Sequence, residues 1–546
     1  MLFKMNKLKV ACLTAAIASS SVSFAGGFLT NTNQNVAFNR MMSREASIGI
    51  DGVYYNPAGV VFLGDGHHLS INWQLAYQDR TIKNDYSLFT NNVNNPITPR
   101  EFKGEAFAPV IPSFQYAYNK GRWSFQGNFA LTGGGGKCTF DNGLGSFERI
   151  VAETAMAACG LARTVDGALG SVLGREVSMF GSDQAFGAGG KYSYNSYMHG
   201  RQYYFGLSLG AAYKVSDNFS VFGGVRGIYA TTNYYGYVED IKVGNMPLYM
   251  VLDPTKKDAA NIELSCDQNG IGFTPIIGVD FKTGKWNFSA KYEFKTRMRL
   301  KNKSVNLVPS IGNLPANLSS QMTQILTAQF TQAGLPAEQA AAKAEATATA
   351  VLANQTVQKT MLGLKNQFDT ELDEAIGEYA DGKKIAADIP AYLSVGVGYS
   401  PIDPLRINVG FHFFDDKNAK AYNNRQEKLD HGTLEYNAGV EYDINKKFTV
   451  SAGWQSTNYG LPEEEATTSK DKRFMDDKSF VTSSNSVGLG GVWHFNKKMS
   501  FTVAYFHTFY QHKKTTESVE LMPGINYSAD YSRNNNVFAA GIDINF

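Results

Sequence analysis

Apolar and polar residues alternate along most of this chain, and the C-terminal end shows the pattern most clearly. Phe538, Ile542 and Phe546 lie on one side of an extended segment, while Asp543 and Asn545 lie on the other. Side chains of a β-strand point to opposite faces in turn, and a strand of about ten residues is long enough to cross a bilayer at a tilt. The segment 537–546 is therefore predicted to be a membrane-crossing strand.

The same alternation recurs upstream, at 286–295, 405–413 and 434–444. In a soluble β-sandwich the aromatic set would meet a dry core, whereas in a membrane barrel it would face lipid. The alternation alone fits either architecture, so the connections between the strands have to decide between them.

Short and long connections follow one another without exception. Six short polar turns lie near residues 120–121, 217–218, 284–285, 402–403, 445–447 and 496–498. Seven longer connections lie at about 84–107, 136–200, 244–268, 304–388, 417–432, 461–479 and 515–535. Membrane barrels have short turns on the periplasmic side and long loops outside. The pattern predicts an all-β fold, an antiparallel transmembrane β-barrel of about fourteen strands, and disfavours a sandwich.

Two segments precede the first strand. Residues 1–25 have a basic start, a short apolar middle and a small-residue end at Ala25, which is the layout of a cleaved signal peptide. Residues 26–66 are rich in small and polar residues and have neither strand alternation nor a long helical period. We interpret 26–66 as a hatch, or plug, inside the barrel formed by residues 67–546, because a barrel of this size encloses more space than its side chains fill.

Composition supports an exported membrane barrel. Charged residues make up 18% of the chain and aromatic residues 13%, and 51 basic residues face 49 acidic ones. A near-neutral balance gives no reason to expect nucleic acid as a partner. After Ala25 no uncharged apolar run approaches the roughly 18 residues of a spanning helix.

With these features the chain resembles the FadL-type outer-membrane transporters of long-chain fatty acids and other hydrophobic compounds. The resemblance covers the mature chain in layout and is concentrated between Ala37 and Gly59, where the motif Asn56-Pro57-Ala58 stands ahead of the barrel. It implies passive uptake through a plugged barrel in the bacterial outer membrane, with sideways release into the membrane. The long loops at 136–200 and 304–388 depart from the family, and no interior residue outside the hatch can be aligned.

Candidate site residues follow from the resemblance and from strand parity. The resemblance implies that the mature N-terminus, Gly26-Gly27-Phe28, reaches the ligand pocket and that Asn56, Pro57 and Ala58 seat the hatch. A fatty-acid carboxylate in the lumen needs a cation, and parity places four basic residues inside. Arg226, Lys291 and Lys295 are the predicted ligand-binding cations near mid-barrel, and Arg406 lies lower down. Pairing of these cations with acids such as Glu293 or Glu441 is the competing interpretation.

Sideways release requires an interrupted strand. Pro109 and Pro112 each remove a backbone donor, and Gly127 breaks the apolar row of the next strand. These three residues are the predicted lateral opening, although simple bends would have the same sequence pattern.

The loops contain further patterns. Leu318, Met322, Ile325, Leu326 and Phe330 have helical spacing, as do Leu364, Phe368, Leu372 and Ile376. Two such helices would form either an apolar landing groove or a cap in which they pack only on each other. A Cys138–Cys159 bridge within one loop would be the easiest disulfide to close.

The sequence predicts no metal site, no cofactor and no catalytic residue, since it lacks CxxC, HExxH, GxSxG and a phosphate-binding loop. The expected partners are a hydrophobic small molecule, outer-membrane lipid with lipopolysaccharide, and the barrel assembly machinery. A secretion shuttle or surface carrier, an outer-membrane lipid-modifying enzyme and a general porin remain as alternative functions.

Overall fold

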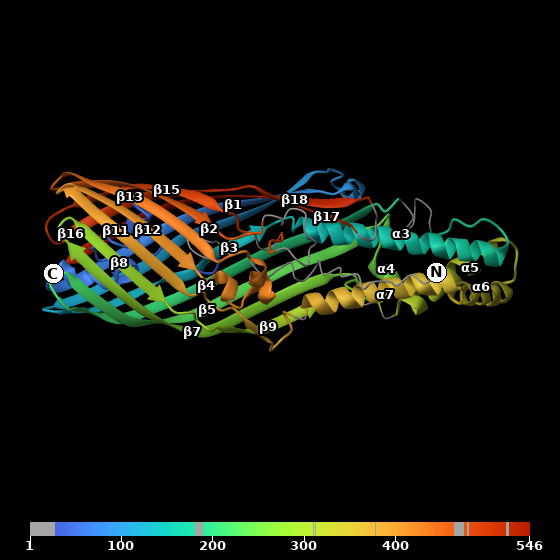
Figure 1. The fold of residues 1–546 in the computed structure, drawn as a ribbon. Coiled ribbons are helices and arrows are strands. Elements are labelled where there is room, and N and C mark those ends of the chain that lie inside the picture. Colours follow the sequence, from blue (N-terminus) through green and yellow to red (C-terminus); the bar gives the residue numbers. More distant parts are fainter. Residues whose placement is uncertain are drawn as a thin grey trace.

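The computed structural model describes residues 28–180, 189–309, 311, 313–376, 378–462, 474–477, 480–519 and 524–546. The predicted signal peptide, Gly26 and Gly27 therefore lie outside the described residues. Within the described chain one antiparallel sheet closes on itself into a barrel (Figure 1). This closed barrel confirms the predicted fold class.

The sheet contains long strands and a few short segments. Its strands are β1 (Gly66–Asp85), β2 (Arg100–Lys120), β3 (Trp123–Phe140), β4 (Tyr192–Lys214), β5 (Phe219–Val243), β6 (Met246–Pro247), β7 (Ile262–Thr283), β8 (Trp286–Glu293), β9 (Arg299–Leu307), β10 (Lys384–Ala386), β11 (Tyr392–Ile402), β12 (Leu405–Phe414), β13 (Thr433–Asn445), β14 (Phe448–Asn458), β15 (Ser484–His494), β16 (Met499–Tyr510), β17 (Lys513–Ser518) and β18 (Asn526–Asn545). Three crossings of the wall are each made of two segments that pair with the same neighbouring crossings: β8 with β9, β10 with β11, and β16 with β17. β6 is a separate segment of two residues. The described wall thus has fourteen crossings, as the turn pattern predicts.

Closure of the barrel joins the two ends of the sheet. β1 pairs with β18 from His68↔Asn545 to Asp85↔Ser528. The terminal residue takes part, because the Phe546 amide donates to the His67 carbonyl at 3.0 Å and the Phe546 carbonyl accepts from the His67 amide at 2.8 Å. The C-terminal aromatic residue therefore lies at the end of the barrel that carries the short turns.

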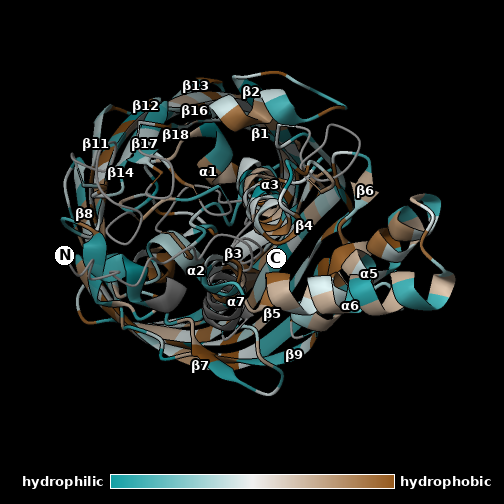
Figure 2. Ribbon diagram, turned by 90° about the vertical axis from the view of Figure 1, so that its right-hand side faces the viewer, coloured by the Kyte–Doolittle hydropathy of each residue, from teal (hydrophilic) through white to brown (hydrophobic). Residues whose placement is uncertain are grey.

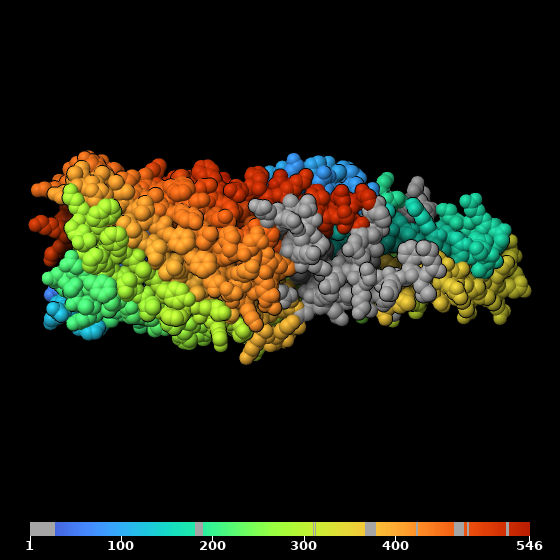
Figure 3. Space-filling model, viewed as in Figure 1, coloured from blue at the N-terminus to red at the C-terminus, as the bar shows by residue number. Residues whose placement is uncertain are grey.

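The two faces of the wall differ as the alternation predicts. Large apolar side chains are exposed on the outside, including Ile271 at 64% and Phe273 at 67%, while polar residues such as Gln115, Asn128 and Asn535 are buried inside. In a membrane the exposed row meets acyl chains, so its exposure carries no penalty. Figure 3 shows the strands as a continuous wall on the face viewed. Among the described residues, no helix is both long enough and apolar enough to cross a membrane.

The hatch lies within the ring of strands. Its short helices α1 (Val36–Arg40) and α2 (Gly52–Tyr55) are inside the barrel in the end-on view of Figure 2, and the 3₁₀ helix η2 (Gly59–Leu63) follows them. Inward glycines let the hatch approach the wall closely: a Cβ at Gly488 would lie 2.3 Å from the Asn39 carbonyl oxygen. A residue with a side chain at position 488 would therefore collide with the backbone of the hatch.

Helices extend beyond the barrel at the end opposite the short turns (Figure 1). The described helices of the long connections are α3 (Gly145–Leu173), α4 (Tyr249–Leu252), α5 (Leu314–Gln332), α6 (Ala337–Leu352) and α7 (Gln355–Ile376), with the 3₁₀ helices η3 (Ser87–Asn91), η4 (Asp416–Asn418) and η5 (Tyr422–Lys428). The two helices predicted from spacing correspond to α5 and α7, whereas α3 and α6 were not predicted. The buried face of α5, with Leu318, Met322 and Phe330, belongs to the same apolar cluster as Ala340 of α6, so this face is covered rather than open as a landing groove.

The sequence left open whether Cys138 and Cys159 form a bridge, and the structure has no disulfide between them. Cys138 lies within β3 and Cys159 within α3. Because β3 extends to Phe140, Cys138 is part of the wall and does not share a loop with Cys159.

Candidate functional site

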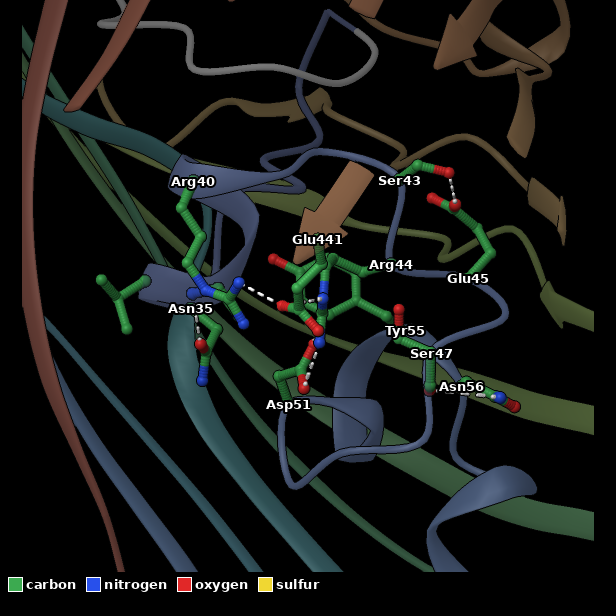
Figure 4. A network of polar contacts seen from close by, with 12 residues as sticks. Asn35, Arg40, Ser43, Arg44, Glu45, Ser47, Asp51, Tyr55, Asn56 and Glu441 are labelled. Carbon is green, nitrogen blue, oxygen red and sulfur yellow. Dashed lines mark hydrogen bonds and ion pairs between the residues drawn. The ribbon is translucent and has the colours of Figure 1, made fainter. Parts of the chain in front are cut away.

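The hatch is fixed to the wall at its base by an ion network. Arg40 of α1 pairs with Glu441 of β13 (Figure 4), and Arg406 of β12 donates to the same carboxylate at 2.6 Å. Arg44 pairs with Asp51 within the hatch, at 2.7 Å between Nε and Oδ2. Glu441 thus joins the hatch to two strands. Arg406, one of the cations predicted to face the lumen, takes part in this network.

A cavity of about 610 Å³ lies below this network, at the end of the barrel with the short turns. Its lining includes Arg40, Arg44 and Glu441 together with Lys285 in the β7–β8 turn. Charged groups at the base of the hatch are therefore within reach of periplasmic water, which lowers the cost of keeping them ionised.

The Asn56-Pro57-Ala58 motif contacts several strands at once. The side-chain amide of Asn56 donates to the Asp280 carboxylate of β7 at 2.6 Å. The Pro57 carbonyl accepts from Gln126 of β3 at 2.7 Å, and the Ala58 carbonyl accepts from the Ser220 hydroxyl of β5, also at 2.7 Å. The turn after Pro57 directs these carbonyls outward to the wall. These contacts support the predicted seating role, which stays a prediction.

Arg226 and Lys291, predicted as ligand-binding cations, lie inside the barrel as parity requires. Arg226 contacts both carboxylate oxygens of Glu293, at 2.6 and 2.9 Å, and Lys291 reaches Glu293 at 3.0 Å. Lys291 also donates to the Tyr54 carbonyl of α2 at 2.7 Å, and its ammonium lies 4.0 Å from the Tyr54 ring centroid. This geometry matches the competing interpretation, in which the cations pair with Glu293, and ligand binding by them stays a prediction.

Lys295 does not follow the parity of its strand. It lies in the interruption between β8 and β9, is exposed, and donates to the Asn418 carbonyl at 3.2 Å. The register of this crossing shifts by one residue between Glu293↔Ile276 and Lys301↔Asn269. A one-residue insertion reverses which side chains face the lumen, so parity beyond Glu293 no longer predicts orientation.

A buried histidine connects the hatch to the upper wall. His412 of β12 contacts Glu45 of the hatch at 2.6 Å through Nε2 and Glu435 of β13 at 2.8 Å through Nδ1. All three side chains are at most 1% exposed. Polar groups buried in this way have to be satisfied by partners, and the contact therefore ties the hatch to its position.

The first described residue of the hatch reaches the outer half of the barrel. The Phe28 ring lies 5.0 Å from Tyr459 and 4.5 Å from Phe474, centroid to centroid. Its amide donates to Asp416 at 3.3 Å, and the Asp416 carboxylate also accepts from the Thr433 hydroxyl at 2.6 Å. Burial raises the pKa of Asp416 from 3.8 to about 7, against the opposing effect of these hydrogen bonds.

The wall itself is interrupted between β2 and β3. Pairing between these strands ends at Ala106↔Cys138 and resumes only at Phe114↔Phe129. Pro109 and Pro112 lie inside the interruption, whereas Gly127 pairs with Tyr116 just below it. Two of the three residues predicted for the lateral opening are therefore in the gap and the third is beside it; their role in release is still a prediction.

The hatch covers this gap from within. The Asn31 amide donates to the Thr132 carbonyl at 2.8 Å, and the Asn31 side chain donates to the Leu131 carbonyl at 2.9 Å. A Cβ at Gly133 would lie 2.3 Å from the Leu29 carbonyl oxygen, so the glycine run of β3 permits this close approach. Carbonyl groups in the part of β3 that does not pair with β2 thus accept hydrogen bonds from the plug.

Two lumen arginines next to the gap did not emerge from the sequence patterns used above. Arg80 of β1 and Arg533 of β18 face each other as a register pair and are 2% and 7% exposed. Their guanidinium groups lie 5.9 Å from the Phe480 ring centroid and 4.7 Å from that of Tyr510, respectively. In the described chain Arg80 Nε donates to Gln78 at 2.9 Å, and Arg80 Nη2 has no hydrogen-bond partner. Extending the parity of 537–546 upstream would have placed Arg533 inside.

A closed barrel of fourteen crossings with a folded segment in its lumen defines a plugged transport barrel. A sequence model of the family described as "Outer membrane protein transport protein (OMPP1/FadL/TodX)" matches residues 189–546. The chain belongs to this family of outer-membrane transport proteins. It is accordingly a multi-pass β-barrel of the outer membrane.

Solved structures agree at the level of the fold. A FadL homologue from Pseudomonas aeruginosa is 14% identical, with 95% of this chain and all of that chain covered and a TM-score of 0.54. The deltaS2 mutant of the TodX monoaromatic hydrocarbon channel is 12% identical, with 94% and 98% covered and a TM-score of 0.50. No curated protein matches the chain significantly. At this identity the structures establish the shared architecture.

Replacing Glu441 by Gln is expected to loosen the hatch, because Arg40 and Arg406 lose their common carboxylate. Removing one partner of a buried ion pair costs about 3–5 kcal/mol, although contact with the cavity below reduces this figure. The measurement is ion conductance of the purified protein in planar bilayers, where we expect frequent openings. Lys103→Gln on the exposed outer surface is the control, and equal conductance of the two variants would contradict the assignment.

The pKa of Asp416 predicts a pH dependence. Burial favours the protonated form of Asp416, so the folded state gains stability from this proton. That contribution to the free energy of unfolding is complete below pH 4 and is lost as the pH rises through about 7. Relative to Asp416→Asn, the wild type should lose stability on the order of 1 kcal/mol per pH unit at most between these limits. Thermal midpoints of both proteins at pH 5 and pH 8 test this, and a constant difference between them would contradict it.

Proposed function

We propose that this protein takes up hydrophobic compounds with an acidic group, such as long-chain fatty acids, and releases them sideways into the outer membrane. The observation that carries the proposal is the unpaired stretch between β2 and β3, with hatch residues Leu29 and Asn31 against it. Lipid-exposed backbone without partners is costly in hydrocarbon. A gap in the wall that the plug covers from within is therefore a suitable exit.

The acidic group of the ligand is proposed to meet Arg80 and Arg533. Two guanidinium groups from directly paired positions repel each other, and a carboxylate placed between them relieves this repulsion through charge-assisted hydrogen bonds. Phe28, Cys138 and Phe480 belong to one buried apolar cluster next to these arginines, which suits an alkyl chain. Cys138 ends the paired part of β3 at the upper edge of the gap, so the arginines and the exit are close.

In this proposal Arg226 and Lys291 act on the hatch rather than on the ligand. Both cations contact Glu293 and lie against Tyr54 of α2. If Tyr54 moved away, its ring would no longer cover the charges of Arg226, Lys291 and Glu293. The position of α2 and the ionisation of this cluster therefore depend on each other. Phe28, between Tyr459 and Phe474, is proposed to leave its aromatic neighbours when a ligand enters.

Arg80→Met is expected to weaken binding of a long-chain acid on the order of tenfold or more, since a charged hydrogen bond contributes about 1.5–3 kcal/mol. Binding of the methyl ester should change little, because the ester brings no charge to the site. The affinities of both ligands for the purified protein are the measurement. Arg226→Met serves as the comparison: selective loss of acid binding in that variant, and not in Arg80→Met, would move the headgroup site to Arg226.

Replacing Pro109 and Pro112 together by Val is expected to lower uptake several-fold, because the new amides allow β2 and β3 to pair across the gap. Uptake of a fluorescent fatty acid by cells that contain equal amounts of folded protein is the measurement. Pro275→Val in β7, which is paired with β5 at Val225 and borders the separate interruption between β8 and β9, is the comparison, and an equal loss in it would contradict an exit confined to the β2–β3 gap. Undiminished uptake in the double variant would contradict sideways release at this place.

A further inference from the structure

The outside of β9 carries a regular row of cations. Arg299, Lys301 and Lys303 alternate along the strand and are exposed, and Arg297 precedes them with the same parity. The intervening Met298, Leu300 and Asn302 are 0%, 3% and 1% exposed and face the lumen. We call Arg297, Arg299, Lys301 and Lys303 the β9 ladder.

The β9 ladder begins where the lipid-facing row of the same crossing ends. From the short β7–β8 turn, Trp286, Phe288 and Phe294 are exposed apolar side chains at 44%, 40% and 43%. Nine residues from Trp286 to Phe294 are enough for one membrane crossing, which takes about 9–11 tilted residues. The ladder is therefore at the outer-leaflet boundary, and Figure 1 shows β9 beyond β8 on the side of the helical extension.

Acyl chains and charged groups can both be contacted at this place. On the neighbouring β7, Asn269 pairs with Lys301, and the exposed Ile271 and Phe273 lie next to Asn269 on the side of the short turns. On the other side Lys384 of β10, also exposed, pairs directly with Lys301. An apolar strip thus borders a cluster of five cations.

The cluster has few acids of its own. Arg299 contacts the buried Asp388 at 2.8 Å, and the exposed Asp267 of β7 pairs with Lys303 in the register. In the part of the chain that the structure describes, no carboxylate lies within 4.0 Å of the charged atoms of Arg297, Lys301, Lys303 or Lys384. Alternate residues of a strand are about 6.6 Å apart, so these cations repel one another unless an anion lies between them.

We propose that the β9 ladder and Lys384 bind the phosphate groups of lipopolysaccharide in the outer leaflet. Several phosphates on one lipid match several cations in a row, and basic residues near a charged membrane surface attract its anionic headgroups. The acyl chains of the same molecule would lie on Ile271 and Phe273. The assignment depends on outer-membrane location and not on which compound the barrel transports.

The double variant Lys301→Glu/Lys303→Glu tests the proposal. The matched control is Lys83→Glu/Lys103→Glu on β1 and β2, which makes the same change of net charge. Each pair of lysines has one carboxylate beside it, since Lys103 lies 3.5 Å from Glu101 and Lys83 pairs with Glu101 in the register, as Lys303 pairs with Asp267. Binding of delipidated, folded protein to lipopolysaccharide, dephosphorylated lipopolysaccharide and phosphatidylglycerol vesicles is measured at low and high salt, with heat-modifiable gel mobility as the check on folding.

We expect the ladder variant to bind intact lipopolysaccharide at low salt at least roughly tenfold more weakly than the wild type, while the control changes less than about threefold. The wild type should prefer intact to dephosphorylated lipopolysaccharide, and high salt should reduce that preference. Equal losses in both variants, equal binding of the dephosphorylated lipid, or a stronger response to phosphatidylglycerol than to lipopolysaccharide would each overturn the proposal.

Discussion

The lumen of a fourteen-stranded barrel is wider than its own side chains fill, and in this protein polar contacts hold the filling in place. Asn35 and Gln115 share a hydrogen bond of 2.8 Å, Arg40 pairs with Glu441, and His412 connects Glu45 to Glu435. A wall whose inner face is polar cannot hold a plug by apolar burial alone, so each buried amide and charge needs a partner on the other side. Water and ligand groups can replace such contacts, which gives the hatch a route to movement that an apolar core would lack.

The interrupted wall makes the position of the hatch and the integrity of the barrel one problem. The carbonyls of Leu131 and Thr132 lie in the part of β3 that does not pair with β2, and Asn31 of the hatch donates a hydrogen bond to each of them. Withdrawal of the hatch from this place would leave those carbonyls without partners beside hydrocarbon, at a cost of several kcal/mol for each group. Under the proposed sideways release, the entering ligand and its water would take the place of the hatch at these carbonyls.

The outer surface is organised by depth in the membrane. Aromatic and aliphatic side chains cover the crossing strands, cations of β9 lie just above them, and α3, α5, α6 and α7 extend further out. The apolar faces of α5 and α6 lie in the same apolar cluster as residues of the barrel and the hatch, so the extension is packed onto the rest of the chain. This order follows from the change of solvent along the barrel axis, from hydrocarbon through charged headgroups to water.

Local patterns in the sequence determined the number of crossings, the side of the short turns, the existence of the hatch and the helices α5 and α7. These features depend on side-chain period and turn residues, which are local along the chain. Parity also placed Arg226 and Lys291 inside, but it failed at Lys295, because an inserted residue in an interrupted strand leaves no mark in the composition. The sequence offered Glu293 as one possible partner of the lumen cations, and the tertiary structure shows that it pairs with both Arg226 and Lys291. Only the tertiary structure paired Arg80 with Arg533 and placed Asn31 against the gap in the wall. Those contacts join residues far apart in the sequence, and closure of the barrel, rather than any local preference, decides which of them meet.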